Sequence, residues 1–238
     1  MAALFAGTSG YAYSSWNPDF YPAKCSSKNF LSFYSRRLNS VEINYTFRQV
    51  PSLKTLESWI EATPPEFRFV IKANQRITHF AKLKGVAQPT LDFLKSLAPL
   101  QVVKRLGPIL FQLPPHFKSD LETLAEFLTV LPKDMHYAFE FRHDSWFGDS
   151  VYELLRRHNA AICVAESETL QVPDVVTADF AYYRLRKSDY SQDERRDIAL
   201  RLKKVMKEVE DVFVFFKHEE TPAGALYAEE LLRELRAS

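Results

Sequence analysis

Tyr137-Ala138-Phe139-Glu140-Phe141-Arg142 alternates apolar and charged side chains. Successive side chains of an extended strand point to opposite faces, so Phe139 and Phe141 share one face and Glu140 and Arg142 the other. Four more apolar runs carry polar positions: Val41-Glu42-Ile43-Asn44, Phe69-Val70-Ile71-Lys72, Leu110-Phe111-Gln112 and Tyr183-Arg184-Leu185-Arg186. Buried charges are costly unless they are paired or used. This recurrence predicts a barrel that builds a site from polar positions on its strands.

Eight short apolar runs predict strands, at about residues 3–7, 41–45, 67–73, 109–113, 137–141, 161–165, 181–185 and 212–216. Segments with helical spacing lie between them, such as Phe30, Phe33, Tyr34 and Leu38, or Leu121, Leu124, Leu128 and Leu131. Strand followed by helix, repeated about eight times without a long polar linker, predicts a parallel sheet with helices outside. We therefore expect an α/β fold, a (β/α)₈ TIM barrel that forms a single domain over residues 1–238.

An open, doubly wound sheet is the alternative architecture. It would normally carry a glycine-rich first turn, and Gly7-Thr8-Ser9-Gly10 matches GxGxxG poorly. With only six glycines in the chain, a phosphate cradle of that type is not expected elsewhere. The barrel is therefore the favoured prediction.

The composition excludes several classes of protein. Lys and Arg total 31 against 30 for Asp and Glu, so net charge gives no argument for a polyanionic partner. The two cysteines, Cys25 and Cys163, lack CxxC spacing, which excludes a cysteine zinc module and fits a reducing cytoplasm. The first residues do not resemble a signal peptide, and no run approaches the roughly 18 apolar residues of a membrane span. We expect a cytoplasmic protein without a membrane partner.

The polar strand positions are the candidate site, because active sites of such barrels lie at the carboxyl ends of the strands. We expect Glu42, Lys72 and Glu140 as catalytic residues and Asn44, Gln112, Arg142 and Arg184 as substrate-binding residues. Lys72 is predicted first as an anion ligand or ion-pair partner and second as a nucleophile. Arg184 is expected nearer the solvent-open mouth, so that its replacement by alanine leaves stability almost unchanged. The competing interpretation is a buried ion network that only fills the barrel.

Further candidates lie in the loops just past the strand ends. Tyr11, Trp146 and His143 complete the predicted substrate-binding set, although a loop mini-core is the alternative for each aromatic ring. Four histidines follow strands, His79, His116, His143 and His218, but no HxH or HExxH spacing supports a metal. We therefore expect neither a metal nor another cofactor.

Six strings, in order along nearly the whole chain, resemble the YecE-like family of uncharacterised TIM-barrel proteins. They are Gly7-Thr8-Ser9-Gly10-Tyr11 with Trp16 and Phe20-Tyr21-Pro22, Val41-Glu42-Ile43-Asn44-Tyr45-Thr46-Phe47, Phe69-Val70-Ile71-Lys72-Ala73, Leu106-Gly107-Pro108-Ile109-Leu110-Phe111-Gln112-Leu113-Pro114-Pro115, Phe139-Glu140-Phe141-Arg142-His143 ahead of Ser145-Trp146, and Thr177-Ala178-Asp179-Phe180-Ala181-Tyr182-Tyr183-Arg184-Leu185. The resemblance implies the TIM-barrel fold and a pocket at the carboxyl ends of the strands.

The family supplies no reaction, because none is firmly assigned to it. Its barrel is similar to those of the xylose isomerase and endonuclease IV group, which implies phosphate or nucleic acid as a ligand at the level of the fold. Two departures add charge at the rim. The family usually reads Arg-Leu-His-Gly after the seventh strand and an Asn-rich turn after the eighth. This chain has Arg184-Leu185-Arg186-Lys187 and Lys217-His218-Glu219-Glu220.

Three functions follow as expectations. The first is an enzyme, hydrolase-like, that acts on a phosphorylated or otherwise anionic small molecule. The second is a protein that holds single-stranded or damaged nucleic acid across the barrel mouth through Arg184, Arg186, Lys187 and the aromatic loops. The third is a ligand-sensing barrel without catalysis. A deep pocket favours the small molecule, whereas binding that falls steeply with salt favours the polymer.

Overall fold

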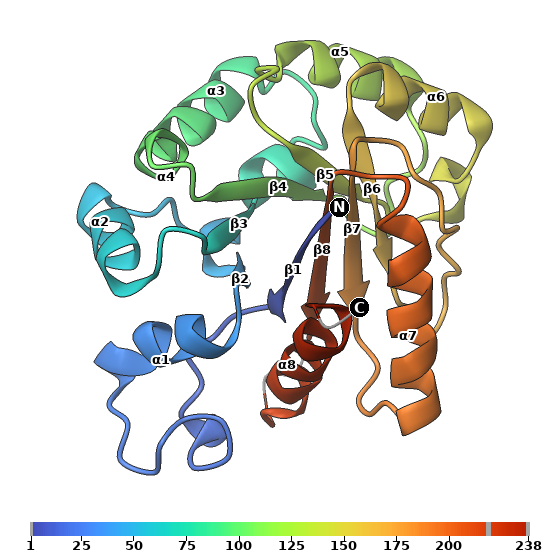
Figure 1. The fold of residues 1–238 in the computed structure, drawn as a ribbon. Coiled ribbons are helices and arrows are strands. Elements are labelled where there is room, and N and C mark those ends of the chain that lie inside the picture. Colours follow the sequence, from blue (N-terminus) through green and yellow to red (C-terminus); the bar gives the residue numbers. More distant parts are fainter. Residues whose placement is uncertain (1, 218–219, 237–238) are drawn as a thin grey trace.

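The computed structural model describes residues 2–217 and 220–236. Its eight strands form one parallel sheet in the order β1-β8-β7-β6-β5-β4-β3-β2, curled into a nearly closed barrel (Figure 1). The strands are β1 (Ala3–Thr8), β2 (Ser40–Ile43), β3 (Arg68–Lys72), β4 (Leu106–Gln112), β5 (Tyr137–Glu140), β6 (Ala160–Ala165), β7 (Phe180–Leu185) and β8 (Asp211–Phe216). The predicted TIM-barrel fold is confirmed, with strand ends shifted by one to three residues.

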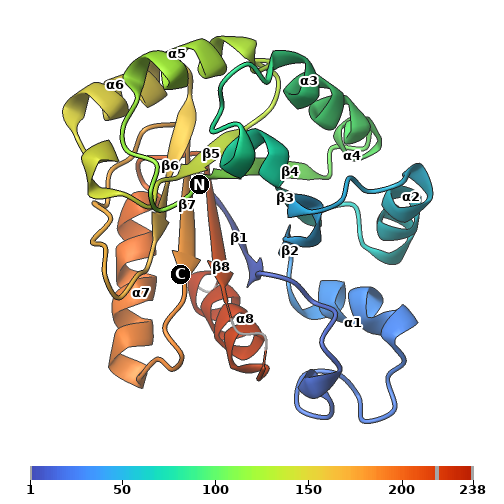
Figure 2. The ribbon, with the colours of Figure 1, turned by 180° about the vertical axis from the view of Figure 1, so that it is seen from behind.

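Helices surround the barrel, as the two opposite views show (Figures 1 and 2). They are α1 (Phe30–Arg37), α2 (Leu53–Ala62), α3 (Ala87–Ser96), α4 (Ala98–Val102), α5 (Leu121–Val130), α6 (Asp149–Arg157), α7 (Gln192–Val205) and α8 (Ala223–Arg236). Within the described residues, no helix is both long and apolar enough to cross a membrane.

The expected strand–helix alternation fails at one connection. Residues 166–179, between β6 and β7, form no helix, whereas α3 and α4 both lie between β3 and β4. The 166–179 segment contains Pro173, which breaks helical hydrogen bonding. Val172, Val175 and Val176 pack against the core from an irregular backbone instead.

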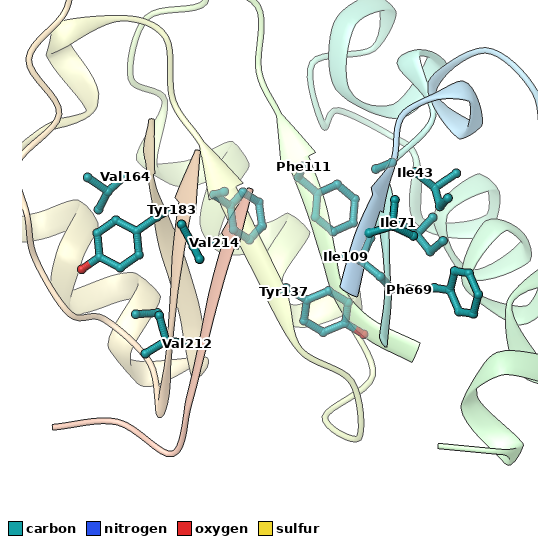
Figure 3. Close-up of a cluster of buried hydrophobic side chains, with 14 of the residues drawn as sticks. Ile43, Phe69, Ile71, Ile109, Phe111, Tyr137, Val164, Tyr183, Val212 and Val214 are labelled. Atoms are coloured by element: carbon teal, nitrogen blue, oxygen red, sulfur yellow. The ribbon is translucent and has the colours of Figure 1, made fainter. Parts of the chain in front are cut away.

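The outward faces of the strands and the helices form the larger part of the core (Figure 3). Phe69 of β3 stacks on Trp59 of α2 with ring centroids 5.3 Å apart, and Phe111 of β4 meets Phe127 of α5 edge-on at 5.1 Å. One face of each strand, which is apolar, therefore packs against the helices. The side chains of the opposite face point into the barrel interior.

The barrel interior is apolar toward the amino ends of the strands. Phe5 of β1 stacks on Phe213 of β8 with centroids 4.8 Å apart, and Phe180 meets the same ring edge-on. Val70, Leu110, Ala138, Cys163, Tyr182 and Phe215 continue this interior cluster. Cys163 is a free thiol, as is Cys25. Polar side chains begin only beyond this apolar plug, at the carboxyl ends.

Side chains replace backbone pairing at the seam between β1 and β2. The two strands share a single bridge, between Ser9 and Glu42. Below it, Asn39 accepts a bond from the Ala6 amide at 2.9 Å and donates one to the Leu4 carbonyl at 2.7 Å. The Tyr34 hydroxyl likewise accepts from the Thr8 amide and donates to the Ser40 carbonyl. These contacts satisfy buried peptide groups that would otherwise lack partners.

Gly7 lies at this seam because β1 and β2 approach too closely for a side chain. A Cβ at residue 7 would lie 1.9 Å from the Ser40 carbonyl oxygen, a backbone atom that cannot rotate away. We expect Gly7→Ala to destabilise the fold by about 1–3 kcal/mol or more, the usual range for overpacking. Guanidinium denaturation would measure the loss.

Gly148→Ala is the matched control, because a Cβ there meets no atom within 4 Å. Gly148 precedes α6 as its N-cap, where alanine is a weaker cap, so a cost below about 1 kcal/mol is expected. Equal losses in the two variants would contradict the tight approach at the seam.

Candidate functional site

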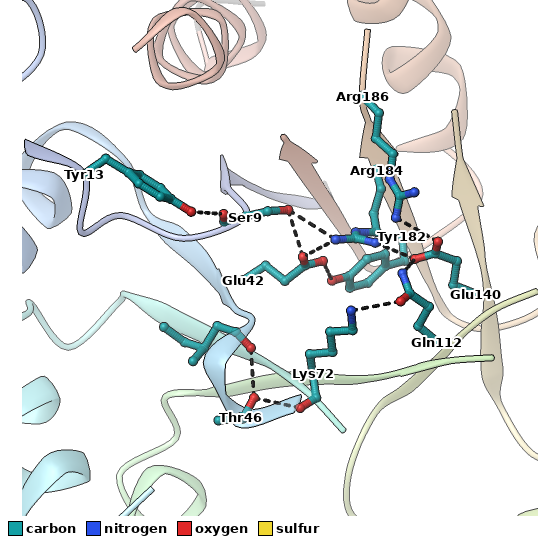
Figure 4. Close-up of polar contacts among 11 residues, drawn as sticks. Ser9, Tyr13, Glu42, Thr46, Lys72, Gln112, Glu140, Tyr182, Arg184 and Arg186 are labelled. Atoms are coloured by element: carbon teal, nitrogen blue, oxygen red, sulfur yellow. Dashed lines mark hydrogen bonds and ion pairs between the residues drawn. The ribbon is translucent and has the colours of Figure 1, made fainter. Parts of the chain in front are cut away.

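Five of the predicted site residues meet in one layer at the carboxyl ends of the strands (Figure 4). They come from β2, β3, β4, β5 and β7: Glu42, Lys72, Gln112, Glu140 and Arg184. Each lies on the face of its strand opposite to the residues that touch the helices. All are buried except Lys72, which is partly exposed. We call these five residues the charged layer.

Arg184 occupies the centre of the charged layer. Its Nη1 lies 2.6 Å from Glu140 Oε2 and its Nη2 lies 2.7 Å from Glu42 Oε1. Its side chain is only 3% exposed. The expectation that Arg184 lies near the solvent-open mouth is therefore wrong. The positive charge of the guanidinium compensates the negative charges of two carboxylates, which could not otherwise be buried together.

Glu42 is held on both oxygens. Oε1 accepts from Ser9 Oγ at 2.8 Å as well as from Arg184, and Oε2 accepts from the Tyr182 hydroxyl at 2.6 Å. Burial alone would raise the pKa of Glu42, but Arg184 and the two hydroxyl donors outweigh it and hold the pKa below its ordinary value. Glu42 is therefore ionised at neutral pH.

Glu140 has a similar set of donors. Oε2 accepts from Gln112 Nε2 at 2.9 Å in addition to Arg184, and Oε1 accepts from Arg186 Nη2 at 2.8 Å. Burial opposes ionisation of Glu140, but the two arginines overcome it and lower its pKa to about 2. A carboxylate with such a low pKa is a weak base, and it carries no proton to donate at neutral pH.

Lys72 is the one cation of the charged layer without a carboxylate partner among the described residues. Its Nζ donates to Gln112 Oε1 at 2.9 Å and lies 4.4 Å from the centroid of the Phe47 ring. Burial and then the charge of Arg184 lower the pKa of Lys72 to about 8, although Glu42 and Glu140 oppose the shift. Lys72 therefore titrates close to physiological pH, as groups at functional sites often do.

The other polar candidates lie around this layer. Arg142 is exposed and does not pair with Glu140, because β5 ends before it. His143 turns back on its own loop, with Nδ1 2.9 Å from Asp144 Oδ1. Asn44 follows β2, and its buried Oδ1 finds no hydrogen-bond donor within residues 2–217 and 220–236. Asn44 therefore keeps a buried polar atom that the described residues do not use.

The two aromatic candidates are packing residues. Trp146 is fully buried, stacks on Phe141 with centroids 4.6 Å apart and donates from Nε1 to the Phe117 carbonyl. Tyr11 packs on Tyr34, and burial raises the pKa of its hydroxyl. The loop mini-core that competed with a binding role accounts for Trp146, so the expectation that it faces a ligand is wrong.

The predicted catalytic and substrate-binding sets lacked four residues that the structure brings to the charged layer or its edge, although Arg186 and His79 were noted near strand ends. Ser9 and Tyr182 bond Glu42, and Arg186 bonds Glu140. Tyr182 stands two residues before Arg184, so the strand period alone would have placed it on the same face. His79 lies close enough for Lys72 and Arg142 to lower its pKa, although burial is the larger cause.

The chemistry of the described side chains does not assemble a metal centre. No group of three or more His, Cys, Asp or Glu side chains with metal-ligating geometry occurs in residues 2–217 and 220–236. His218, one of the four loop histidines, lies outside the described residues. The expectation of a metal-free protein remains a prediction for elemental analysis.

A cleft of about 810 Å³ opens beside the charged layer, although none of the five residues of the layer lines it. Arg186 connects the two, because it lines the cleft and pairs with Glu140. The other lining residues of the cleft come from the ends of β6, β7 and β8: Glu166, Ser167, Glu168, Thr169, Lys187, Ser188 and Lys217. A larger cavity of about 950 Å³ lies at the opposite end, around Leu4, Phe5 and Met206, and contains no residue of the layer.

Fold and layer together define a parallel α/β barrel with a preorganised charged centre at the carboxyl ends of its strands. The chain matches the family described as "Protein of unknown function DUF72" over residues 5–238, and it belongs to that family. The resemblance to YecE-like proteins is thereby confirmed.

Two curated relatives support the assignment. The UPF0759 protein YunF of Bacillus subtilis is 30% identical over 156 residues, which cover 63% of this chain and 54% of YunF. The UPF0759 protein YecE of Escherichia coli K12 is 35% identical over 118 residues, covering 49% of this chain and 43% of YecE. The matched part of the chain thus spans about half the length of these relatives.

Solved structures agree with the fold. A DUF72 family protein from Thermotoga maritima superposes with a TM-score of 0.86 at 26% identity, covering 98% of this chain and 99% of that one. A family 2 AP endonuclease from Brucella melitensis has a TM-score of 0.56 at 10% identity over 100% of this chain and 99% of its own. That second likeness shows the barrel fold alone.

Proposed function

We propose that the barrel mouth binds a phosphorylated or otherwise anionic small molecule and that the protein is an enzyme acting on it. The observation that carries this proposal is the unpaired cation of the charged layer. Two buried carboxylates, Glu42 and Glu140, face three cations, Arg184, Arg186 and Lys72. The arginines are held by the carboxylates, so a bound anion would supply the missing partner of Lys72.

The proposal changes the roles expected for Glu42 and Glu140. Both were expected as catalytic residues, but both are ionised and accept hydrogen bonds on each of their oxygens. In this proposal they hold Arg184 and Arg186 in place. Lys72 takes the reactive role, because a pKa near 8 leaves a usable fraction of neutral amine at physiological pH. For a hydrolytic reaction this amine would be the base.

The rim supports an anionic substrate. Lys72 and Arg142 both lie close enough to His79 for their charges to lower its pKa, and His116 has the same effect. Arg186 and Lys187 line the cleft beside the layer. Charge-assisted bonds from such side chains favour phosphate and carboxylate groups.

The nucleic-acid alternative draws less support from the side chains that it needs. Arg184 is buried between two carboxylates and Lys187 pairs with Glu194. A polymer would have to be held mainly by the remaining rim cations. Tight binding of an oligonucleotide, with affinity falling steeply as salt rises, would favour this alternative over the small-molecule proposal.

Lys72→Met tests the proposal, because methionine keeps the length of the stem and removes the charge. We expect the wild-type protein to bind inorganic phosphate and Lys72→Met to bind it at least tenfold more weakly, since a hydrogen bond to a charged group contributes about 1.5–3 kcal/mol. Isothermal titration calorimetry at pH 7 would measure both affinities.

Lys204→Met is the matched control, since this exposed lysine lies at the last turn of α7, whose neighbouring residues Lys203 and Met206 line the cavity at the opposite end of the barrel. It should bind phosphate as the wild type does. The proposal fails if the wild type shows no phosphate binding at millimolar concentrations or if both lysine variants bind alike.

A further inference from the structure

The surroundings of the Lys72 amine suit a nucleophile as well as an anion ligand. Arg184 and Arg186 are fixed by ion pairs, whereas Lys72 Nζ has only the neutral Gln112 amide as a hydrogen-bond acceptor among the described residues. Lys72 is the member of the charged layer that is partly exposed, whereas the other four are buried. An amine without a carboxylate partner loses its proton more easily, and only the neutral amine has a lone pair for attack.

Phe47 and Gln112 restrict where the amine can point. Phe47 lies against Nζ and in turn packs edge-on against His79, with ring centroids 4.8 Å apart. Gln112 is itself held by Glu140 through its Nε2. The nitrogen is thereby oriented by residues of β4 and of the loop after β2, in the way that a preorganised reactive group is held.

We infer that Lys72 forms an imine with small anionic aldehydes or ketones, the carbonyl carbon meeting Nζ while the anionic group contacts the cations around it. The inference rests on the proposed function and narrows its substrate class to carbonyl-bearing anions. Arg186, 22% exposed and with a buried Nε that has no acceptor among the described residues, offers one contact for the anionic group.

The step is balanced without an oxidant or a metal. The lone pair of neutral Nζ forms a bond to the carbonyl carbon, and the C=O π pair moves to oxygen, which takes up a proton. Loss of one proton from nitrogen gives a neutral carbinolamine. The hydroxyl then takes up a proton and departs as water, driven by the nitrogen lone pair, which leaves a protonated C=N bond. Loss of that proton gives the neutral imine, and hydrolysis reverses the sequence.

His79 is the candidate to move these protons, because it and the Lys72 amine both pack against the Phe47 ring. Its Nδ1 shares a hydrogen bond with Thr78 Oγ1 at 2.9 Å. Burial and the neighbouring cations lower the pKa of His79, so the imidazole is neutral at physiological pH and can accept a proton. It belongs to the one-turn π-helix Arg76–Phe80, a conformation that recurs at functional sites.

Reductive trapping with glyoxylate and cyanoborohydride at pH 7.5 tests the inference, with peptide mapping by mass spectrometry as the readout. We expect a carboxymethyl group on Lys72 at least tenfold faster than on exposed lysines, competition by inorganic phosphate, and a rate that rises with pH through about 8. Lys72→Arg keeps the charge and should give no adduct in the mouth. In the Lys204→Arg variant, Lys72 should be labelled at the same rate as in the wild type.

The outcomes separate the two claims. Phosphate binding by the wild type with no preferential labelling of Lys72 would overturn the imine and leave the proposed function intact. Selective labelling of Lys72 without any phosphate binding would support a reactive amine and overturn the anionic substrate. Labelling that follows surface exposure, with Lys72 no faster than Lys204, would overturn the inference outright.

Discussion

Arg184→Met is expected to lower the free energy of unfolding by about 3–5 kcal/mol, the range for breaking a buried ion pair. Methionine fills much of the same space but leaves Glu42 and Glu140 without the guanidinium that both of them share. Neither carboxylate can reach water, since both are buried. Guanidinium denaturation at pH 7.5 would measure the loss.

Arg186→Met is the comparison that makes this result specific. Arg186 also pairs with Glu140, but it is partly exposed, and Glu140 keeps Arg184 when Arg186 is removed. A loss of about 1.5–3 kcal/mol in the free energy of unfolding is expected, that of one hydrogen bond to a charged group. If Arg184→Met lowers the free energy of unfolding no more than Arg186→Met does, Arg184 does not have the central position assigned to it.

Glu140→Gln is expected to destabilise the protein by a similar amount, about 3–5 kcal/mol at neutral pH. The substitution keeps the shape of the side chain and removes the charge opposite both Arg184 and Arg186. It should also depress the pKa of Lys72 further, because Glu140 is one of the charges that raise it. Guanidinium denaturation at several pH values would measure the loss of stability.

The pH dependence has a definite sign. The pKa of Glu140 is about 2 in the folded protein, whereas the ordinary glutamate value of 4.5 applies to the unfolded chain. The Glu140 carboxylate therefore stabilises the fold fully above about pH 4.5, and this stabilisation is lost as the pH falls toward 2. The difference between wild type and Glu140→Gln should therefore shrink over that interval. A difference that is independent of pH would show that the charge of Glu140 is not what stabilises the fold.

The double variant Arg184→Met/Glu140→Gln provides an internal check. The two groups are in direct contact, so each single substitution includes the penalty for the partner left behind. The double variant should lose less stability than the sum of the two single losses. Strict additivity would mean that the two side chains do not act as a pair.

The alternation of the strands made much of the site predictable. In β3, Phe69 and Ile71 face the helices, which leaves Val70 and Lys72 for the interior. The same period places Glu140 and Arg184 inside the barrel. Parallel strands bring their carboxyl ends to one edge, so these side chains had to lie close to one another.

Other features depend on where a strand ends and on which partners are nearest, and the strand period does not contain that information. In the sequence pattern, Arg142 falls on the same strand face as Glu140. In the structure β5 ends at Glu140, and Arg142 is exposed. Trp146 is drawn into the stack with Phe141 and Phe117, where a large ring buries more surface than it would at the mouth. The depth of Arg184 follows from its two carboxylate partners, one of them 142 residues away in the chain.

The most direct test of the central claim is an NMR titration of the Lys72 side chain, with and without sulfate, which stays a dianion across the whole range. Loss of the assigned signal in Lys72→Arg would identify it. We predict a midpoint near pH 8 in the free protein, against the ordinary lysine value of 10.5, and a higher midpoint with sulfate, because an anion stabilises the charged amine. A midpoint near 10.5, or one that sulfate does not move, would contradict the assignment of Lys72 as the anion-binding, reactive group of the barrel.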